Sequence, residues 1–242
     1  MKNLVERYSS LAPHELDYTQ LLEETNVFGR GKYLVDDDEA RKKLATLLAE
    51  AEAHEDLKAA WRCLTTGAHY SPDDMKVSCE LEYWIFFEPG KFSRILYVGS
   101  GAYPHIALYV LERDPKIIFD CIDIVPHTTV LCSQLAAKLG YRDRLRPFTG
   151  DAIALEKSVI ERFDAFFISS AVRPKNAMIE HLLCHKRNEA RIYAREDEAH
   201  PAFYEPVRIT HPDLLTAREA RTRWAKEKGA PLALPKGCEV DG

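Results

Sequence analysis

Two glycines follow the first strongly apolar run of the chain and form its clearest candidate binding loop. The run spans residues 94–98, and Gly99, Ser100 and Gly101 come directly after it. Glycines between a strand and a helix let the backbone turn sharply and approach a bound molecule closely, at the positive end of the helix. A dinucleotide fingerprint carries a third glycine where this chain has Pro104. Since an ordinary tight turn gives the same pattern, the loop alone is weak evidence for a ligand.

Two acidic positions follow the next apolar runs and strengthen the signal. Asp123 stands at the end of the second run, where a carboxylate can accept hydrogen bonds from two ribose hydroxyls. Beyond the third run, Asp151 lies between Gly150 and Ala152, placed to accept from an adenine amino group while a neighbouring amide contacts the ring. One Asp at a strand end is more often a helix cap than a ligand. Three such features on three successive strand ends indicate a nucleoside site.

The elements that must position these residues begin after Pro89-Gly90, where the character of the chain changes. From there short apolar runs alternate with helical patterns, which predicts right-handed crossovers and a parallel sheet covered by helices on both faces. We expect strands at 94–98, 117–124, 145–148, 163–168 and 191–194, and helices at 106–112, 129–139, 152–161 and 176–186.

The apolar spacing of the first ninety residues predicts helices, and no strand-type alternation occurs there. A short helix is expected after Pro13, and a longer one begins near residue 40 behind the N-cap candidates Asp36, Asp37 and Asp38. Its apolar spacing resumes, after a short break, as far as residue 64. The predicted organisation is an N-terminal helical layer at 1–90, an α/β cofactor-binding domain at 91–210, and a C-terminal helix and tail at 211–242, with the helix at 215–228.

Composition excludes several classes of protein. The chain has 242 residues with 33 Lys plus Arg against 38 Asp plus Glu, a formal charge of −5, and no basic block. That balance argues against binding to nucleic acid or to an anionic membrane. No apolar run approaches the roughly 20 residues of a membrane span, and the start lacks the apolar core of a secretory signal. We expect a cytoplasmic protein with a small-molecule partner; its oligomeric state is left open, a homodimer among the alternatives.

The six cysteines and the histidines do not indicate a disulfide framework or a metal site. None of the cysteines forms a C-x-x-C pair. The one arrangement similar to a metal site is His181, Cys184 and His185, and no second cluster completes a tetrahedral set of ligands. The sequence therefore predicts no metal.

The order of glycine loop, ribose acid and adenine acid resembles the Rossmann-like class I S-adenosylmethionine-dependent methyltransferase fold. Within that fold, Gly99-Ser100-Gly101 with Pro104 is similar to the G-S-G-x-x-P loop of nicotianamine synthase and its bacterial relatives that make opine-type metallophores. The resemblance implies transfer of the 3-amino-3-carboxypropyl arm of S-adenosylmethionine to an amine, with release of methylthioadenosine. Further matches are YSSLA at 8–12, IEHL at 179–182 and AFYEPV at 202–207.

The transfer requires a base, because an amine must lose its proton before it can attack. Glu80, Glu82 and Tyr83 lie where the family carries its acid and tyrosine, and we predict that the base is among them. A solvated Glu pair beside core aromatics explains either Glu equally well.

Three further residues are predicted to line the site. Tyr103, just after the glycines, is placed to contact the methionine arm; a core aromatic is the alternative. Arg195 follows the fifth run, as an Arg does in the family, and can hold a substrate carboxylate by a two-pronged contact; a surface ion pair is the alternative. Ser169, at the end of the fourth run, occupies a position where the family has small residues that make room for the cofactor.

One segment departs from the family pattern and leaves the acceptor open. Residues 171–174 include Arg173 and Pro174, where the family has small and apolar residues. The leading hypothesis is transfer to a small amino-acid amine such as that of histidine. The alternatives are cyclisation, in which the amine of S-adenosylmethionine displaces its own sulfonium to give azetidine-2-carboxylate, an ordinary small-molecule methyltransferase, and a cofactor-binding protein without catalysis.

Overall fold

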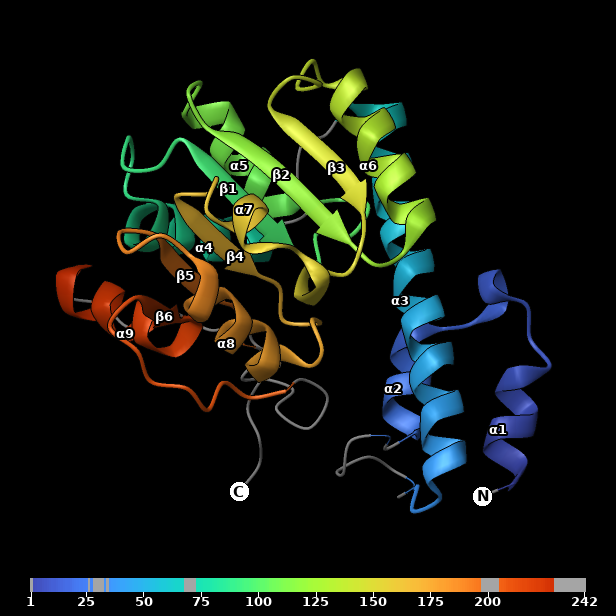
Figure 1. Ribbon diagram of the computed structural model, residues 1–242. Helices are drawn as coiled ribbons and strands as arrows, with labels where there is room; N and C mark the ends of the chain where they lie inside the picture. The colour runs from blue at the N-terminus through green and yellow to red at the C-terminus, as the bar shows by residue number, and fades with distance from the viewer. Residues whose placement is uncertain are drawn as a thin grey trace.

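A parallel β-sheet forms the centre of the protein (Figure 1). The computed structural model describes residues 2–25, 27, 33, 35–67, 73–196 and 205–228. Within them six strands lie in the order β3-β2-β1-β4-β5-β6, and every neighbouring pair is parallel. The strands are β1 (Arg94–Val98), β2 (Ile118–Asp123), β3 (Leu145–Thr149), β4 (Ala165–Ile168), β5 (Arg191–Ala194) and β6 (Leu214–Thr216).

Alternate strand residues enter two separate hydrophobic cores. Ile95 and Tyr97 of β1 face one core, and Leu96 and Val98 face the other. A sheet buried on both faces requires the continuous apolar runs seen in the sequence. The first core is covered by α4 (Asp73–Glu82), α5 (His105–Arg113), α6 (Pro126–Lys138) and α9 (Ala217–Lys228), and the second by α7 (Lys157–Ile160) and α8 (Lys175–His185).

This architecture confirms the α/β class I methyltransferase fold predicted from the sequence, with two local corrections. The segment 152–161 is not one helix: η3 (Ala152–Ala154) is a single 3-10 turn, capped by Asp151, and α7 follows it separately. The C-terminal segment also begins with the short strand β6, which pairs with β5, before α9 starts. A run of three residues carries too little periodicity to separate a strand from the first turn of a helix.

Helix α3 (Asp38–Thr66) joins the N-terminal layer to the rest of the protein (Figure 1). The expected break near residue 55 is absent, and the helix runs for 29 residues, roughly 44 Å at 1.5 Å per residue. The Asp37 carboxylate accepts from the amides of Glu39 and Ala40, and Gly67 ends the helix with φ +72°.

The two halves of α3 belong to different cores. Its first half packs with α1 (Lys2–Ser9), η1 (Pro13–Glu15) and α2 (Tyr18–Glu24) in a small core of its own, whereas Ala60 and Cys63 enter the first core of the sheet. After α4, the π-helical turn η2 (Tyr83–Phe87) stacks Phe87 on Phe167 of β4. The boundaries drawn at residues 90 and 210 stay predictions.

The described cysteines are free thiols. Within the described part of the chain, no helix is both long and apolar enough to cross a bilayer. Cys63, Cys79, Cys121 and Cys132 are buried thiols and Cys184 is exposed, while Cys238 lies outside the described residues. Among those residues no three metal-ligating side chains converge; His185 Nδ1 instead bonds the carbonyl of His181.

Candidate active site

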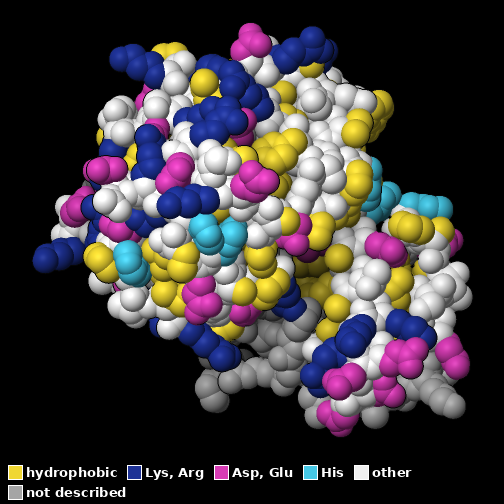
Figure 2. Space-filling model, in the orientation of Figure 1, with side chains coloured by type: hydrophobic (Ala, Val, Ile, Leu, Met, Phe, Trp, Pro, Cys, Tyr) yellow, Lys and Arg dark blue, Asp and Glu magenta, His cyan; other side chains and the backbone are white. Residues whose placement is uncertain are grey.

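The carboxyl ends of the strands meet along one edge of the sheet, opposite α3. Neighbouring strands β1 and β4 lead into connections that run in opposite directions, which is where open α/β sheets form a ligand crevice. A cavity of about 510 Å³ lies there, lined by residues of α3 and of the loops after β1, β2, β3, β4 and β5. Figure 2 shows the surface hollowed between the body of the protein and the α3 side, with hydrophobic side chains in the hollow.

The glycine loop after β1 forms one wall and tolerates no larger residues. Gly99 and Gly101 have φ of +70° and +63°, in the left-handed region that favours glycine. A Cβ on Gly99 would lie 2.5 Å from Cγ2 of Val172, and one on Gly101 would lie 2.3 Å from Oδ2 of Asp56. The backbone conformation therefore favours glycine at both positions, and a side chain at Gly99 would also meet Val172, whereas one at Gly101 would displace the Asp56 carboxylate.

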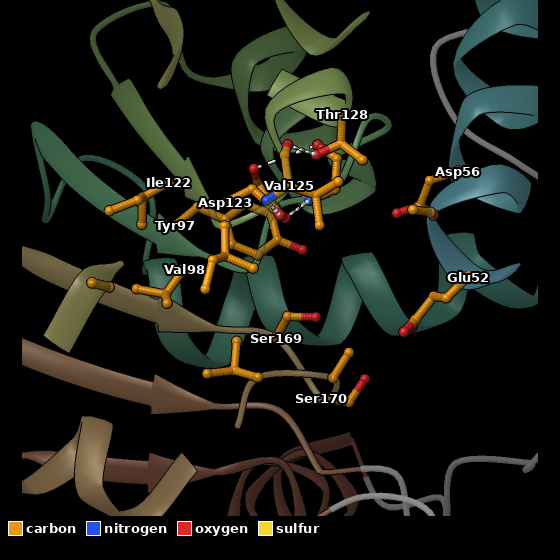
Figure 3. Close-up of a pocket in the computed structure, with 18 of the residues that line it drawn as sticks. Glu52, Asp56, Tyr97, Val98, Ile122, Asp123, Val125, Thr128, Ser169 and Ser170 are labelled. Carbon is orange, nitrogen blue, oxygen red and sulfur yellow. Dashed lines mark hydrogen bonds between the residues drawn. The ribbon is translucent and has the colours of Figure 1, made fainter. Parts of the chain in front are cut away.

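Asp123 ends β2 inside the cavity and is tied to the glycine loop. One carboxylate oxygen accepts from the amide of Gly101 at 2.9 Å, and the other from the amide of Val125 at 2.9 Å (Figure 3). Each carboxylate oxygen has two lone-pair sites, so these bonds leave acceptor capacity for two further donors. A pair of neighbouring hydroxyls on one ligand would use that capacity.

The loop after β3 and the segment after Asp123 add a second wall. Gly150, Asp151 and Ala152 line the cavity, as the sequence predicts. The Asp151 carboxylate is exposed and accepts from the amide of Ile153, so it caps η3 as well. Ile124 also lines the cavity and is 71% exposed, which gives a flat ring an apolar surface to lie on.

Arg195 reaches the cavity from the end of β5, and Glu82 holds it from behind. Its Nε and Nη2 donate to the two oxygens of Glu82 at 2.8 and 2.5 Å, and the Tyr193 hydroxyl donates to the same carboxylate at 3.2 Å. Glu82 is only 1% exposed, and the guanidinium carbon lies 5.2 Å from the centre of the Phe167 ring. This bidentate pair fixes the cation in one orientation at the cavity wall.

The three candidate bases do not line the cavity. Glu82 is occupied by Arg195, and Glu80 is exposed on α4. Tyr83 is buried and packs edge-on against Trp84 and Tyr109, and burial raises the pKa of its phenol. Their catalytic role stays a prediction that this arrangement does not favour. Tyr103 and Ser169, by contrast, both lie at the cavity.

Sequence reasoning missed two carboxylates that face the cavity. Glu52 and Asp56 stand four residues apart on α3 and point toward the cavity from the side opposite Ser169 and Ser170 (Figure 3). The spacing i, i+4 puts them on one helix face, and that spacing was the available signal. On a helix this rich in acidic residues, a solvated face gives the same signal, so the sequence could not single them out.

Burial and crowding shift the titration of these groups. Burial raises the pKa of Glu52 to about 7; the nearby Asp123 carboxylate adds to the rise and Arg173 opposes it. Burial, with the charges of Glu52 and Asp123, raises the pKa of Asp56 to about 8, although a hydrogen bond with the backbone of Ala102 opposes the rise.

His105, which the sequence analysis also missed, lines the same cavity as a neutral side chain. Burial, together with the charge of Arg195, lowers the pKa of its imidazole to about 3. Its ring centre lies 4.4 Å from that of Tyr103. The imidazole is therefore uncharged at neutral pH and packs as an aromatic group.

The more distant sequence matches lie apart from the cavity. Tyr8 is buried in the N-terminal core, where its hydroxyl donates to Glu24 at 3.1 Å. Residues 179–182 lie on α8, and 202–204 are outside the described residues. Glu205 accepts from the amides of Lys175 and Asn176 at the start of α8. Within the described part, these matches support the frame around the cavity and not its lining.

Comparison with solved structures agrees with the fold. A point mutant of MtNAS, a nicotianamine synthase, aligns with a TM-score of 0.54 and 17% identity over 85% of both chains. The same mutant in complex with S-adenosylmethionine aligns with a TM-score of 0.51 and 17% identity over 85% of this chain and 84% of that one. An O-methyltransferase from Bacillus cereus in complex with SAH aligns with a TM-score of 0.42 and 16% identity over 57% of this chain and 64% of that one. No protein-family model matches the sequence, and no curated protein does. The MtNAS alignments confirm the predicted fold.

The raised pKa of Asp56 predicts a pH-dependent stability. Between about pH 4 and pH 8 the native carboxyl keeps a proton that the unfolded chain has lost, so the native state binds more protons and its stability falls as pH rises. Asp56→Asn removes this loss. Relative to wild type, we expect the variant to gain about 2–4 kcal/mol in free energy of unfolding between pH 5 and pH 8.5, measured by urea denaturation.

Glu50→Gln is the matched control, since Glu50 is exposed on the same helix and does not line the cavity. Its stability relative to wild type should be flat across this range. Parallel pH profiles for Asp56→Asn and wild type would contradict the burial of an uncharged Asp56.

Proposed function

We propose that this protein binds S-adenosylmethionine in the cavity at the carboxyl edge of the sheet and catalyses a reaction of its sulfonium. The observation that carries the proposal is Asp123, which lies in the cavity and accepts from the amide of Gly101 at 2.9 Å. An acid at the end of β2, bonded to the glycine loop after β1, is the arrangement that orients a ribose in this class of fold. The exposed Ile124 and the loop at Gly150 and Asp151 then suit the adenine ring.

We further propose attack at the chain carbon and not at the methyl group. The fold is shared with MtNAS, a nicotianamine synthase, one mutant of which has been solved in complex with S-adenosylmethionine. Arg195, fixed by Glu82, offers a carboxylate anchor where β5 ends at the cavity. Anchoring the carboxylate of the aminocarboxypropyl arm leaves the choice of reacting carbon to the position of the nucleophile.

The reaction requires the protein mainly to orient the amine and the sulfonium relative to each other. A sulfonium has three carbon neighbours, and the cationic sulfur is already a good leaving group at each of them. Since the methyl carbon is the least hindered, only in-line placement of the amine favours the chain carbon. Transfer to a small amino-acid amine is the leading form of the reaction; cyclisation to azetidine-2-carboxylate needs no external acceptor.

The first test removes the ribose acid. Asp123→Ala should weaken binding of S-adenosylmethionine by roughly 1.5–3 kcal/mol, a factor of about 10 to 150, because a charge-assisted pair of hydrogen bonds is lost. Isothermal titration calorimetry measures the change. Asp123→Asn keeps an acceptor for the amide of Gly101 and should give an intermediate loss.

Asp143→Ala serves as the control, since Asp143 is exposed and does not line the cavity. Unchanged affinity in a folded Asp123→Ala variant would remove Asp123 from the site.

The second test identifies the nucleoside product. Purified protein incubated with S-adenosylmethionine should release methylthioadenosine faster than a no-enzyme control and faster than Asp123→Ala, as measured by mass spectrometry. The control is needed because S-adenosylmethionine also breaks down spontaneously. Methylthioadenosine formed only when histidine or another amino acid is present indicates transfer. Methylthioadenosine formed without any amine, together with azetidine-2-carboxylate, indicates cyclisation. S-adenosylhomocysteine with a methylated acceptor would contradict both and indicate a methyltransferase.

A further inference from the structure

Displacement at the sulfonium leaves one requirement that the predicted bases do not meet. The attacking amine enters as an ammonium and must lose a proton to a group within hydrogen-bond reach. Glu80, Glu82 and Tyr83 are not among the residues that line the cavity. The acceptor must therefore be sought among the described residues that do.

Most titratable side chains at the cavity are unsuited to this role. Asp123 already accepts two backbone amides, and Asp151 is exposed and caps η3. The pKa of His105, lowered to about 3 by burial and by Arg195, makes its imidazole a weak base. Burial raises the pKa of Tyr97 well above its ordinary value, so its phenol stays protonated.

Glu52 and Asp56 have the geometry that the role requires. Both side chains point toward the cavity from α3, across from the strand ends (Figure 3). Asp56 lies directly against the glycine loop, since a Cβ added to Gly101 would be 2.3 Å from its Oδ2. A molecule held by Asp123 and this loop therefore has the α3 pair on its open side. The helix that carries them is anchored at both ends, in the N-terminal core and in the core of the sheet.

The charges around the pair favour a cation. The groups that act on it are Asp123 from β2, Arg173 before α8, Glu55 on the same helix and Cys132 on α6. Three carboxylates, Glu52, Asp56 and Asp123, thus act on one another, and Arg173 is the cation whose charge acts on Glu52. The pKa of Glu52, about 7, matches a general base that works near neutral pH.

We propose that Glu52 and Asp56 together accept the proton of the attacking ammonium. This inference rests on the proposed function. As the N–H proton moves to the carboxylate pair, the nitrogen lone pair forms the N–C bond to the chain carbon, and the C–S bond breaks with its electrons passing to sulfur. The sulfonium becomes the neutral thioether of methylthioadenosine, and the proton later leaves to solvent. Two adjacent carboxylates titrate as a unit, so the pair and not either member alone holds that proton.

The test compares amide and carboxylate variants of the pair. Glu52→Gln with Asp56→Asn should form methylthioadenosine about a hundredfold more slowly at pH 7 and saturating S-adenosylmethionine, with a loss of affinity for this cation of at most about tenfold. The deficit should shrink to below about tenfold at pH 9.5, where an α-amine with a pKa of about 8 loses its proton unaided. The swapped pair, Glu52→Asp with Asp56→Glu, keeps both carboxylates and should stay within about tenfold of wild type.

A control variant and two different outcomes separate a failure of this inference from a failure of the proposed function. Glu50→Gln, exposed on the same helix, should turn over like wild type. If the double amide variant does not fold, the single variants carry the same test. A folded amide variant that binds S-adenosylmethionine and turns over at the wild-type rate at pH 7 would overturn the inference alone. Wild-type protein that yields S-adenosylhomocysteine would overturn the proposed function, and the inference with it, before any variant is compared.

Discussion

The left-handed turn of the glycine loop is the constraint on which the rest of the site depends. It lets the chain leave β1 between two close neighbours, Val172 and Asp56, in a backbone conformation that favours glycine. The same turn directs the amide of Gly101 at Asp123. One loop thereby fixes the relative positions of β1, β2, the segment after β4 and helix α3. Asp123, Ser169, Glu52 and Asp56 are each placed by one of those elements, whereas Asp151 and Arg195 reach the cavity from the ends of β3 and β5.

The charged groups around the cavity favour a cationic ligand. Glu52, Asp56 and Asp123 are brought together in partial burial, which raises the pKa of the first two to about 7 and about 8. Like charges held together are costly, and a bound cation relieves that cost. A site of this kind suits a cationic reactant better than a neutral thioether product, which is the direction of charge change in any displacement at a sulfonium. Arg195, held by Glu82 and lying beside the Phe167 ring, brings a guanidinium to the cavity wall at the end of β5.

Sequence patterns were sufficient to predict the features that follow from backbone geometry. Apolar runs buried on both faces, separated by helical segments, specify a parallel sheet, and glycine and acid at successive strand ends pointed to Gly99, Gly101, Asp123 and Asp151, which the structure places at the cavity. Sequence patterns did not predict the side-chain contacts that depend on tertiary packing. Glu82 has the residue type of a base, but the half-buried Arg195 holds its carboxylate, and that partner is 113 positions away in the chain. Glu52 and Asp56 are ordinary helix-surface acids until α3 is laid across the strand ends.

The most direct test of the account is a crystal structure of the protein with S-adenosylmethionine bound. The account predicts adenosine in the cavity, with both ribose hydroxyls within about 3 Å of the Asp123 carboxylate and the amine of the methionine arm, or an acceptor amine, on the side of Glu52 and Asp56. A nucleoside bound elsewhere, or a methyl group directed at an acceptor while the chain carbon is covered, would contradict it.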